Sequence, residues 1–102
     1  MSVVLVVTAI PVPEHQADVT AAFEAAAAKV HKEPGVVRWA LLQGHDRLVV
    51  IEKYESERAR AEHARGTALA ELRAALRGKL STDLDVQVLA ERPVGDLAKG
   101  QI

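Results

Sequence analysis

The stretch that decides the fold reads Glu33-Pro34-Gly35-Val36-Val37-Arg38-Trp39-Ala40-Leu41-Leu42. Pro34 cannot continue a helix that arrives from the N-terminal side, because its ring fixes φ and removes a backbone donor. Gly35 supplies a turn, and the apolar run that follows predicts a strand from Val36 to about Gln43. This strand carries Trp39, the single Trp of the chain. A helix end, a turn and a strand start therefore meet in one short segment.

Upstream of Pro34 the sequence predicts a strand and a helix. The run from Val3 to Ile10 is apolar without alternation, which is typical of a strand buried on both faces. Pro13 suits the first position of a helix that runs to about Lys32. The apolar stripe of this helix is Val19, Phe23, Ala26, Ala27 and Val30.

Downstream, Gly44-His45-Asp46 predicts a hairpin turn that leads into a strand over 48–54. Ser56 is expected to cap a short helix that ends near Arg65. After Gly66, Thr67 is expected to cap a second helical piece, with an apolar stripe of Leu69, Leu72, Leu76 and Leu80. Residues 84–91 alternate as a fourth strand. The order β-α-β-β-α-β predicts an α+β, ferredoxin-like fold: a four-stranded antiparallel sheet with the helices on one face.

The strands carry more apolar surface than two helices can cover. In the second strand, Val37, Trp39 and Leu41 are expected on one face, and the other face holds Val36, Arg38, Ala40 and Leu42. The first and third strands are apolar on both faces as well. Because a large apolar patch is costly in water, we expect a homodimer that packs sheet to sheet. A monomer with unusually hydrophobic strands is the alternative.

Composition narrows the function classes. The 102 residues suit one domain, and a net charge of −1 without a run of one sign indicates no nucleic-acid or membrane partner. There is no Cys, no metal-ligand spacing of His, Asp and Glu, and no glycine-rich phosphate loop. The N-terminal residues lack a basic leader and a cleavage site, so we expect a cytoplasmic protein.

Two motifs resemble a known family. One is Glu33-Pro34-Gly35 before the strand of Trp39; the other is Glu52-x-Tyr54-x-Ser56-x-x-Ala59-x-x-x-His63 at a strand–helix junction. In this order they are similar to the antibiotic biosynthesis monooxygenase family of dimeric α+β barrels, which includes small quinol monooxygenases. We expect a family domain over 1–92 and a C-terminal tail over 93–102. The tail is similar to an extension of some actinobacterial members, and the resemblance implies that it reaches the partner subunit.

The resemblance implies a cavity between sheet and helices that binds a quinol-like or polycyclic phenolic substrate. Family members oxidise such compounds with O₂ without metal, flavin or haem, so no cofactor is expected. The protein must then bind a flat apolar ligand, accept a proton and stabilise an oxyanion.

His63 is the candidate catalytic residue. It lies one helical turn beyond Ala59 on the same side, so it faces the sheet if Ala59 does. An imidazole there can accept a phenolic proton near neutral pH. The alternative is an exposed His between Glu62 and Arg65.

Five further residues are candidates for substrate binding. Trp39 offers a flat wall and Tyr54 a hydroxyl, although both also suit a core or a sheet end. Glu52 needs a partner on an inward face, and an ion pair with Arg38 or Arg73 is the structural alternative. The set comprises Trp39, Tyr54, Thr8, Glu52 and Arg73.

Thr8 and Arg73 also bear on a related branch of the superfamily, which degrades haem. That branch uses an Asn on the first strand and a haem-ligating His on the last helix. Thr8 and Arg73 stand at the matching positions, which argues against haem cleavage. Many members have Trp where this chain has Tyr54, so its substrate contacts are expected to differ.

The resemblance and the candidate residues leave three functions open. The first is a cofactor-independent monooxygenase with His63 as proton acceptor. The second is a non-catalytic module that binds an apolar ligand in the same cavity. The third is another reaction of the superfamily, such as isomerisation or decarboxylation.

Overall fold

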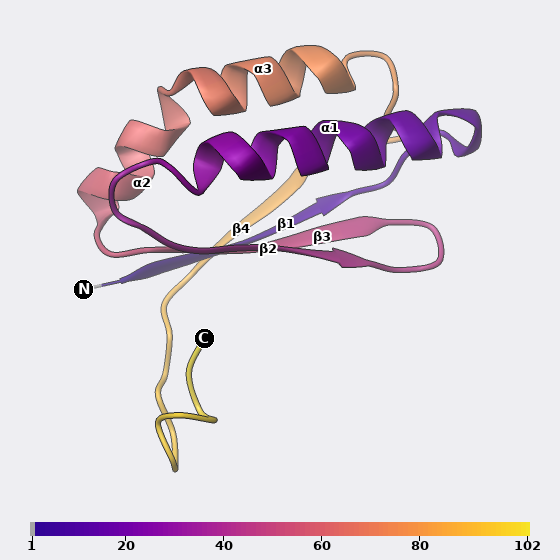
Figure 1. Cartoon of the computed structure of the whole chain (residues 1–102). Helices are drawn as coiled ribbons and strands as arrows, with labels where there is room; N and C mark the ends of the chain where they lie inside the picture. Colours follow the sequence, from indigo (N-terminus) through magenta and orange to yellow (C-terminus); the bar gives the residue numbers. More distant parts are fainter. Residues whose placement is uncertain (1) are drawn as a thin grey trace.

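A computed structural model of the chain describes residues 2–102. Its elements follow the predicted order, with the second helical region divided in two (Figure 1). In chain order they are β1 (Val3–Ala9), the 3₁₀ turn η1 (Pro13–His15), α1 (Gln16–Val30), β2 (Val36–Gln43), β3 (Leu48–Tyr54), α2 (Glu57–Ala64), α3 (Thr67–Leu76) and β4 (Asp85–Leu89).

The four strands form one antiparallel sheet in the order β2-β3-β1-β4. Figure 1 shows all three α-helices on the same face of this sheet. The order and the single helical layer confirm the α+β, ferredoxin-like fold. The two central strands, β1 and β3, pair along their whole length, from Val3 opposite Tyr54 to Ala9 opposite Leu48.

Strand alternation separates the sheet into two faces, here called inner (toward the helices) and outer. On the inner face, Leu5 and Val7 of β1 and Val50 and Tyr54 of β3 are buried in the main core. α1 covers this core with the predicted stripe, of which Val19, Phe23, Ala26 and Val30 are buried. The stripe places the apolar side of α1 on the sheet, and so the core lies between helices and inner face.

A β-bulge corrects the expected alternation of β2. Val36 pairs with Tyr54, but Arg38 already pairs with Lys53, so one residue of β2 is extra. Val36 therefore packs against the core instead of sharing the outer face with Arg38. Beyond the bulge, Trp39 lies opposite Glu52 on the inner face, as predicted.

Helix ends differ from the sequence prediction at three places. α1 ends at Val30 and not near Lys32. α3 ends at Leu76, because Arg77 leaves the helical region and Gly78 takes φ +76°, so Leu80 instead forms a bridge with Pro11. The cap of α3 is Gly66 and not Thr67, whereas Ser56 caps α2 as predicted by accepting from Ala59 N at 3.1 Å.

The outer face is apolar and carries no helix. The pairings of β1 with β3, β3 with β2 and β1 with β4 place seven apolar side chains there. Two of them are about half exposed, Leu42 at 54% and Leu89 at 45%. The seven are Val4, Val6, Ala40, Leu42, Val49, Ile51 and Leu89.

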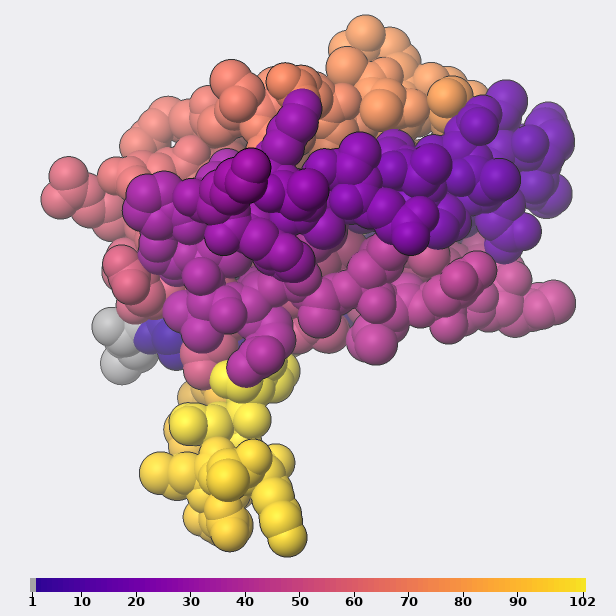
Figure 2. Space-filling model, viewed as in Figure 1, coloured from indigo at the N-terminus to yellow at the C-terminus, as the bar shows by residue number. Residues whose placement is uncertain are grey.

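The C-terminal tail extends from the outer side of the sheet (Figures 1 and 2). Its end returns to β3, where Lys53 Nζ donates to the Ile102 carbonyl at 2.6 Å and pairs with Glu91 at 2.6 Å. Ile102 N in turn donates to Glu91 Oε2 at 2.9 Å. Three polar groups thus fasten the end of the chain to the outer face. Within residues 2–102, no helix is long and apolar enough to cross a bilayer.

Candidate functional site

A cavity of about 120 Å³ lies between the inner face of the sheet and the helices α2 and α3. Apolar side chains from every layer form most of its wall. The polar groups among its lining are Glu52 of β3, Arg60 and His63 of α2, Arg73 of α3 and the indole of Trp39. The apolar lining comprises Leu5, Val7, Phe23, Val30, Ala64, Ala68, Leu69, Leu72, Leu84 and Val86.

His63 lies inside the fold, with 7% of its surface exposed. Ala59, one turn earlier on α2, is also buried, so the two residues face the sheet together as their spacing predicted. The ring Nδ1 lies 2.6 Å from Glu33 Oε1, and Nε2 lies 3.9 Å from Glu52 Oε1. His63 is therefore not the exposed residue of the alternative interpretation.

The Nδ1 contact sets the state of the imidazole. A carboxylate accepts only, so Nδ1 carries the hydrogen that it donates to Glu33. In the neutral ring, Nε2 then holds a lone pair, and among residues 2–102 Nε2 makes no hydrogen bond. The gap of 3.9 Å toward Glu52 leaves Nε2 available to a ligand hydroxyl in the cavity.

Glu52 and Tyr54 form a buried pair beside this ring. The Tyr54 hydroxyl donates to Glu52 Oε1 at 2.5 Å, and the Tyr54 ring lies 5.2 Å from the His63 ring between centroids. Burial raises the pKa of Glu52, and the Tyr54 hydrogen bond and His63 partly oppose the rise. Burial, followed by the charge of Glu52, raises the pKa of Tyr54 far above its ordinary range. Tyr54 is thus a hydrogen-bond donor and no proton acceptor.

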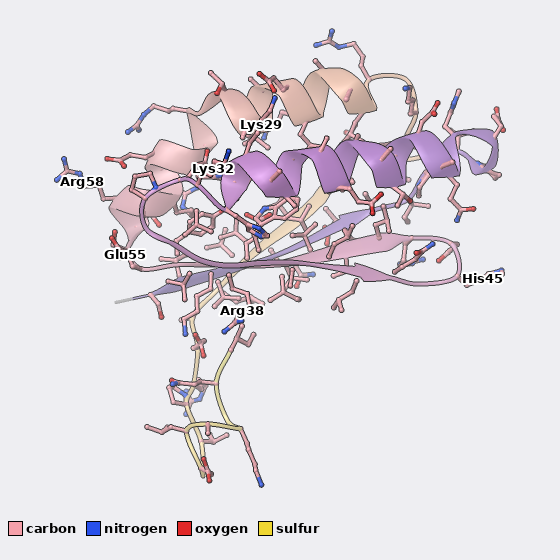
Figure 3. The ribbon with its side chains drawn as sticks, viewed as in Figure 1. Lys29, Lys32, Arg38, His45, Glu55 and Arg58 are labelled. Carbon is pink, nitrogen blue, oxygen red and sulfur yellow. The ribbon has the colours of Figure 1, made fainter. Side chains whose placement is uncertain are left out.

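This pair corrects the expected ion pair of Glu52 with Arg38 or Arg73. Arg38 lies opposite Lys53, on the outer face, and Figure 3 shows it on the side of the sheet away from the helices. Arg73 is exposed at the edge of the cavity and makes no ion pair with Glu52. Glu52 finds its partner two residues away on its own strand, because alternate residues share a face.

Trp39 forms one wall of the cavity. Its ring stacks on Phe23 at 6.3 Å between centroids and 28° between planes, and His31 Nε2 lies 2.9 Å from its carbonyl oxygen. Phe23 of α1 thus holds the indole, and His31, the residue after α1, contacts the backbone of Trp39. Trp39 is thus both a core residue and a cavity residue, so its two predicted interpretations are compatible.

Thr8 and Tyr54 do not line the cavity. Thr8 alternates with Leu5 and Val7 along β1 and so lies on the outer face, which corrects the expectation that its hydroxyl reaches the cavity. Tyr54 is fully buried. It acts on the site through its hydrogen bond to Glu52 and through the contact of its ring with the His63 ring.

Sequence reasoning missed three contributors: Glu33, Arg60 and Phe23. Phe23 was predicted as a core residue in the apolar stripe of α1. The same side of α1 also lines the cavity. Arg60 lies one residue after Ala59, and its guanidinium is bound to Glu57 with distances of 2.5 to 2.9 Å. Glu33 had a sequence signal, since it opens the Glu33-Pro34-Gly35 motif, but that motif indicates only a turn.

The site can bind a flat apolar ring and accept one proton. No group of three or more His, Asp or Glu residues within 2–102 is arranged to hold a metal ion. The lining supplies one imidazole with a free Nε2, one buried carboxyl and two arginines around an apolar volume. That set suits acid–base chemistry on a small aromatic ligand.

Comparisons with solved structures support the same fold. A Mycobacterium tuberculosis protein superposes with a TM-score of 0.86 at 24% identity, covering 90% of this chain and 96% of its own. A conserved protein from Methanosarcina mazei has a TM-score of 0.84 at 16% identity, and the match covers 90% of this chain and 94% of that protein. A cofactor-independent oxygenase from Streptomyces nogalater has a TM-score of 0.76 at 20% identity, and the match covers 91% of this chain and 95% of the oxygenase.

No protein of curated function matches the chain. The sequence model of the antibiotic biosynthesis monooxygenase family, however, matches residues 2–79, which include both motifs and every element from β1 to α3. With a match over most of its length, the chain belongs to the antibiotic biosynthesis monooxygenase family.

Proposed function

We propose that this protein is a cofactor-independent monooxygenase that oxidises a single-ring phenol or quinol with O₂. The observation that carries the proposal is the free Nε2 of buried His63 in an apolar cavity walled by Trp39. Family membership and the oxygenase among the structural relatives support the reaction class.

In this reaction His63 Nε2 takes the proton of the substrate hydroxyl, and the resulting anion reduces O₂ directly. A phenol and one O₂ contain the atoms of a quinone and one water, so the substrate supplies all the electrons. One oxygen atom enters the ring and the other leaves as water. The charge of the exposed Arg73 at the cavity edge favours the anion, and Arg60, whose guanidinium is already paired with Glu57, adds less.

The cavity volume favours a single ring over a polycyclic substrate. An apolar cavity of about 150 Å³ in another protein accepts benzene. The 120 Å³ available here is of that size and is too small for three fused rings without rearrangement. Trp39 and Phe23 supply the flat contact, and Glu52, held by Tyr54, supplies the polar contact for a second hydroxyl.

The experiment is O₂ consumption by metal-free protein with hydroquinones of one ring, and with an anthrone for comparison. We expect turnover with the smaller compounds and a loss of about 100-fold or more in kcat for His63→Gln, the usual range for removal of a general base. His45→Gln is the matched control, because His45 is exposed in the β2–β3 hairpin (Figure 3). A folded protein without turnover on any of these compounds would contradict the proposal.

A second candidate is a module that binds a small aromatic ligand without reaction. The support for this candidate is the small cavity volume of about 120 Å³. A bound ring of benzene size would leave little room for O₂ beside it. The ligand would quench Trp39 fluorescence and be recovered unchanged after aerobic incubation. Recovery of a quinone instead would exclude this candidate.

For the assembly we propose a homodimer through the outer face. The support is the row of apolar side chains on β1, β2 and β3 without a covering layer, together with the tail that projects from the same side (Figures 1 and 2). A tail in that position is able to lie against the partner subunit. Two sheets that pack face to face would bury both apolar faces at once.

Light scattering after gel filtration tests this assembly. We expect Ile51→Lys, which puts a charge at the centre of the outer face, to give a monomer. Ala74→Lys on the exposed side of α3 is the control and should remain dimeric. A monomeric wild-type protein would contradict the proposed dimer. It would not bear on the proposed reaction, which the O₂-consumption assay tests separately.

A further inference from the structure

Glu33 is placed against the catalytic helix by the turn that joins α1 to β2. Its amide donates to the Val30 carbonyl at 2.9 Å, and its carbonyl accepts from Val36 N at 3.4 Å. The backbone of Glu33 is therefore tied to the end of α1 and to the start of β2. Its side chain is 21% exposed and contacts His63, which lies 30 residues away in sequence.

Two glycines make this approach possible. Gly35 takes φ +84°, and a Cβ on it would lie 2.5 Å from the Ala59 Cβ. A Cβ on Gly66 would lie 3.0 Å from Glu33 Oε2. The first glycine brings the turn onto α2 one helical turn before His63, and the second leaves room for the Glu33 carboxylate beside the end of α2.

The charges around His63 single out Glu33 as the partner of its ring. From β3, Glu52 lies 3.9 Å from Nε2, and its Oε1 already accepts from Tyr54. From α2 itself, Arg60 is bound to Glu57. Glu33 is the group at hydrogen-bonding distance, 2.6 Å from Nδ1.

We infer that Glu33 is a positioning residue: its carboxylate holds the His63 ring with Nε2 toward the cavity and compensates the charge that the ring gains when it takes a proton. The catalytic consequence rests on the proposed oxygenase reaction. The proton moves from the substrate hydroxyl to Nε2, the Nδ1 hydrogen stays between the ring and Glu33, and the substrate is left as its anion. A charge-assisted hydrogen bond to a carboxylate strengthens as the ring becomes cationic.

The decisive variant is Glu33→Gln, which keeps an acceptor for Nδ1 but removes the negative charge. Loss of the charge-assisted hydrogen bond should weaken the hold on the Nδ1 hydrogen of His63, so its proton resonance should move upfield or disappear by exchange with water. Nuclear magnetic resonance of the ring follows this signal, and His63→Gln assigns it among the four histidines. We expect kcat to fall about tenfold with KM little changed, because the charge of Glu33 acts when the ring takes the proton.

Glu62→Gln is the matched control. It removes the same charge from the same helix, but Glu62 is exposed and its nearest basic partner is Arg58, at 3.4 Å. The Nδ1 proton resonance of His63 and the kcat of this variant should equal those of the wild type. Gly66→Ala is a second test that leaves Glu33 intact, because the added methyl group crowds the carboxylate. It should move the Nδ1 proton resonance in the same direction as Glu33→Gln.

The two failures are distinguishable. If Glu33→Gln and Glu62→Gln share one Nδ1 proton resonance of His63, the role of Glu33 is refuted, whatever the activity. If the wild type oxidises no quinol but Glu33→Gln still alters this resonance, the positioning role stands and the oxygenase function fails. Should Glu33→Gln not fold, the resonance of Gly66→Ala decides.

Discussion

Gly35 provides the sharpest test of how the turn is joined to α2. A substitution by alanine meets two obstacles: φ of +84° and an Ala59 Cβ only 2.5 Å from the new methyl group. The left-handed conformation costs about 1–2 kcal/mol for a residue other than glycine. Overpacking of a well-packed contact costs about 1–3 kcal/mol more. Gly35→Ala should therefore lower the free energy of unfolding by about 2–5 kcal/mol, a large part of the about 5–15 kcal/mol of a typical domain.

Gly78 is the matched control for this measurement. It has φ +76°, yet a Cβ there would meet no atom within 4 Å. Gly78→Ala should cost about 1–2 kcal/mol, since only the conformational part remains. Both substitutions reduce the freedom of the unfolded chain equally, so that effect cancels in the comparison.

The assay is denaturation in urea, followed by circular dichroism and by the fluorescence of Trp39 at one fixed protein concentration. In the background of Ala59→Gly, the cost of Gly35→Ala should fall by about 1–3 kcal/mol, because the overpacked partner is gone. The reasoning is refuted if Gly35→Ala costs no more than Gly78→Ala, or if Ala59→Gly leaves its cost unchanged.

Two further predictions concern Glu52 and Ser56. Because burial raises the pKa of Glu52, its protonated form stabilises the fold at a pH below the unfolded value of about 4.3, and this contribution is lost as the pH rises through the higher folded value. The melting temperature of Glu52→Gln relative to the wild type should thus increase from pH 4 to pH 8, and a constant difference would contradict this. Ser56→Ala should cost about 1 kcal/mol, since Ser56 caps α2 through Ala59 N. Thr67→Ala, at a helix start without a side-chain cap, should cost clearly less in the same urea titration, and equal costs would count against the cap.

Local patterns predicted the elements, because each depends on residues close in sequence. Pro34 and Gly35 marked the helix stop, and the alternation after Gly44 marked β3. The end of α3 was set too late because its leucine stripe continues to Leu80, whereas the helix breaks before Gly78. A stripe reports which side of a helix is buried and not where its backbone stops.

The candidate site was predictable only in part. The spacing of Ala59 and His63 placed both on one side of α2, but only the structure shows that this side faces the sheet. The contact of Glu33 with His63 could not be predicted from the sequence, because it depends on how the α1–β2 turn packs against α2. Gly35 and Gly66 allow the close approach of these two segments. The bulge in β2 was hidden for the same reason, because register is a property of two strands and not of one.

The order of strands in the sheet also bears on synthesis of the chain. β1 is made first but stands between β3 and β4, the last two strands to leave the ribosome. Until Tyr54 has emerged, the apolar run Val3–Ala9 has no strand to pair with, whereas β2 and β3 form a local hairpin as soon as both are made. A nascent chain halted in α1 would expose a β-branched strand with two free edges, which is the kind of segment that associates with other chains and that chaperones bind.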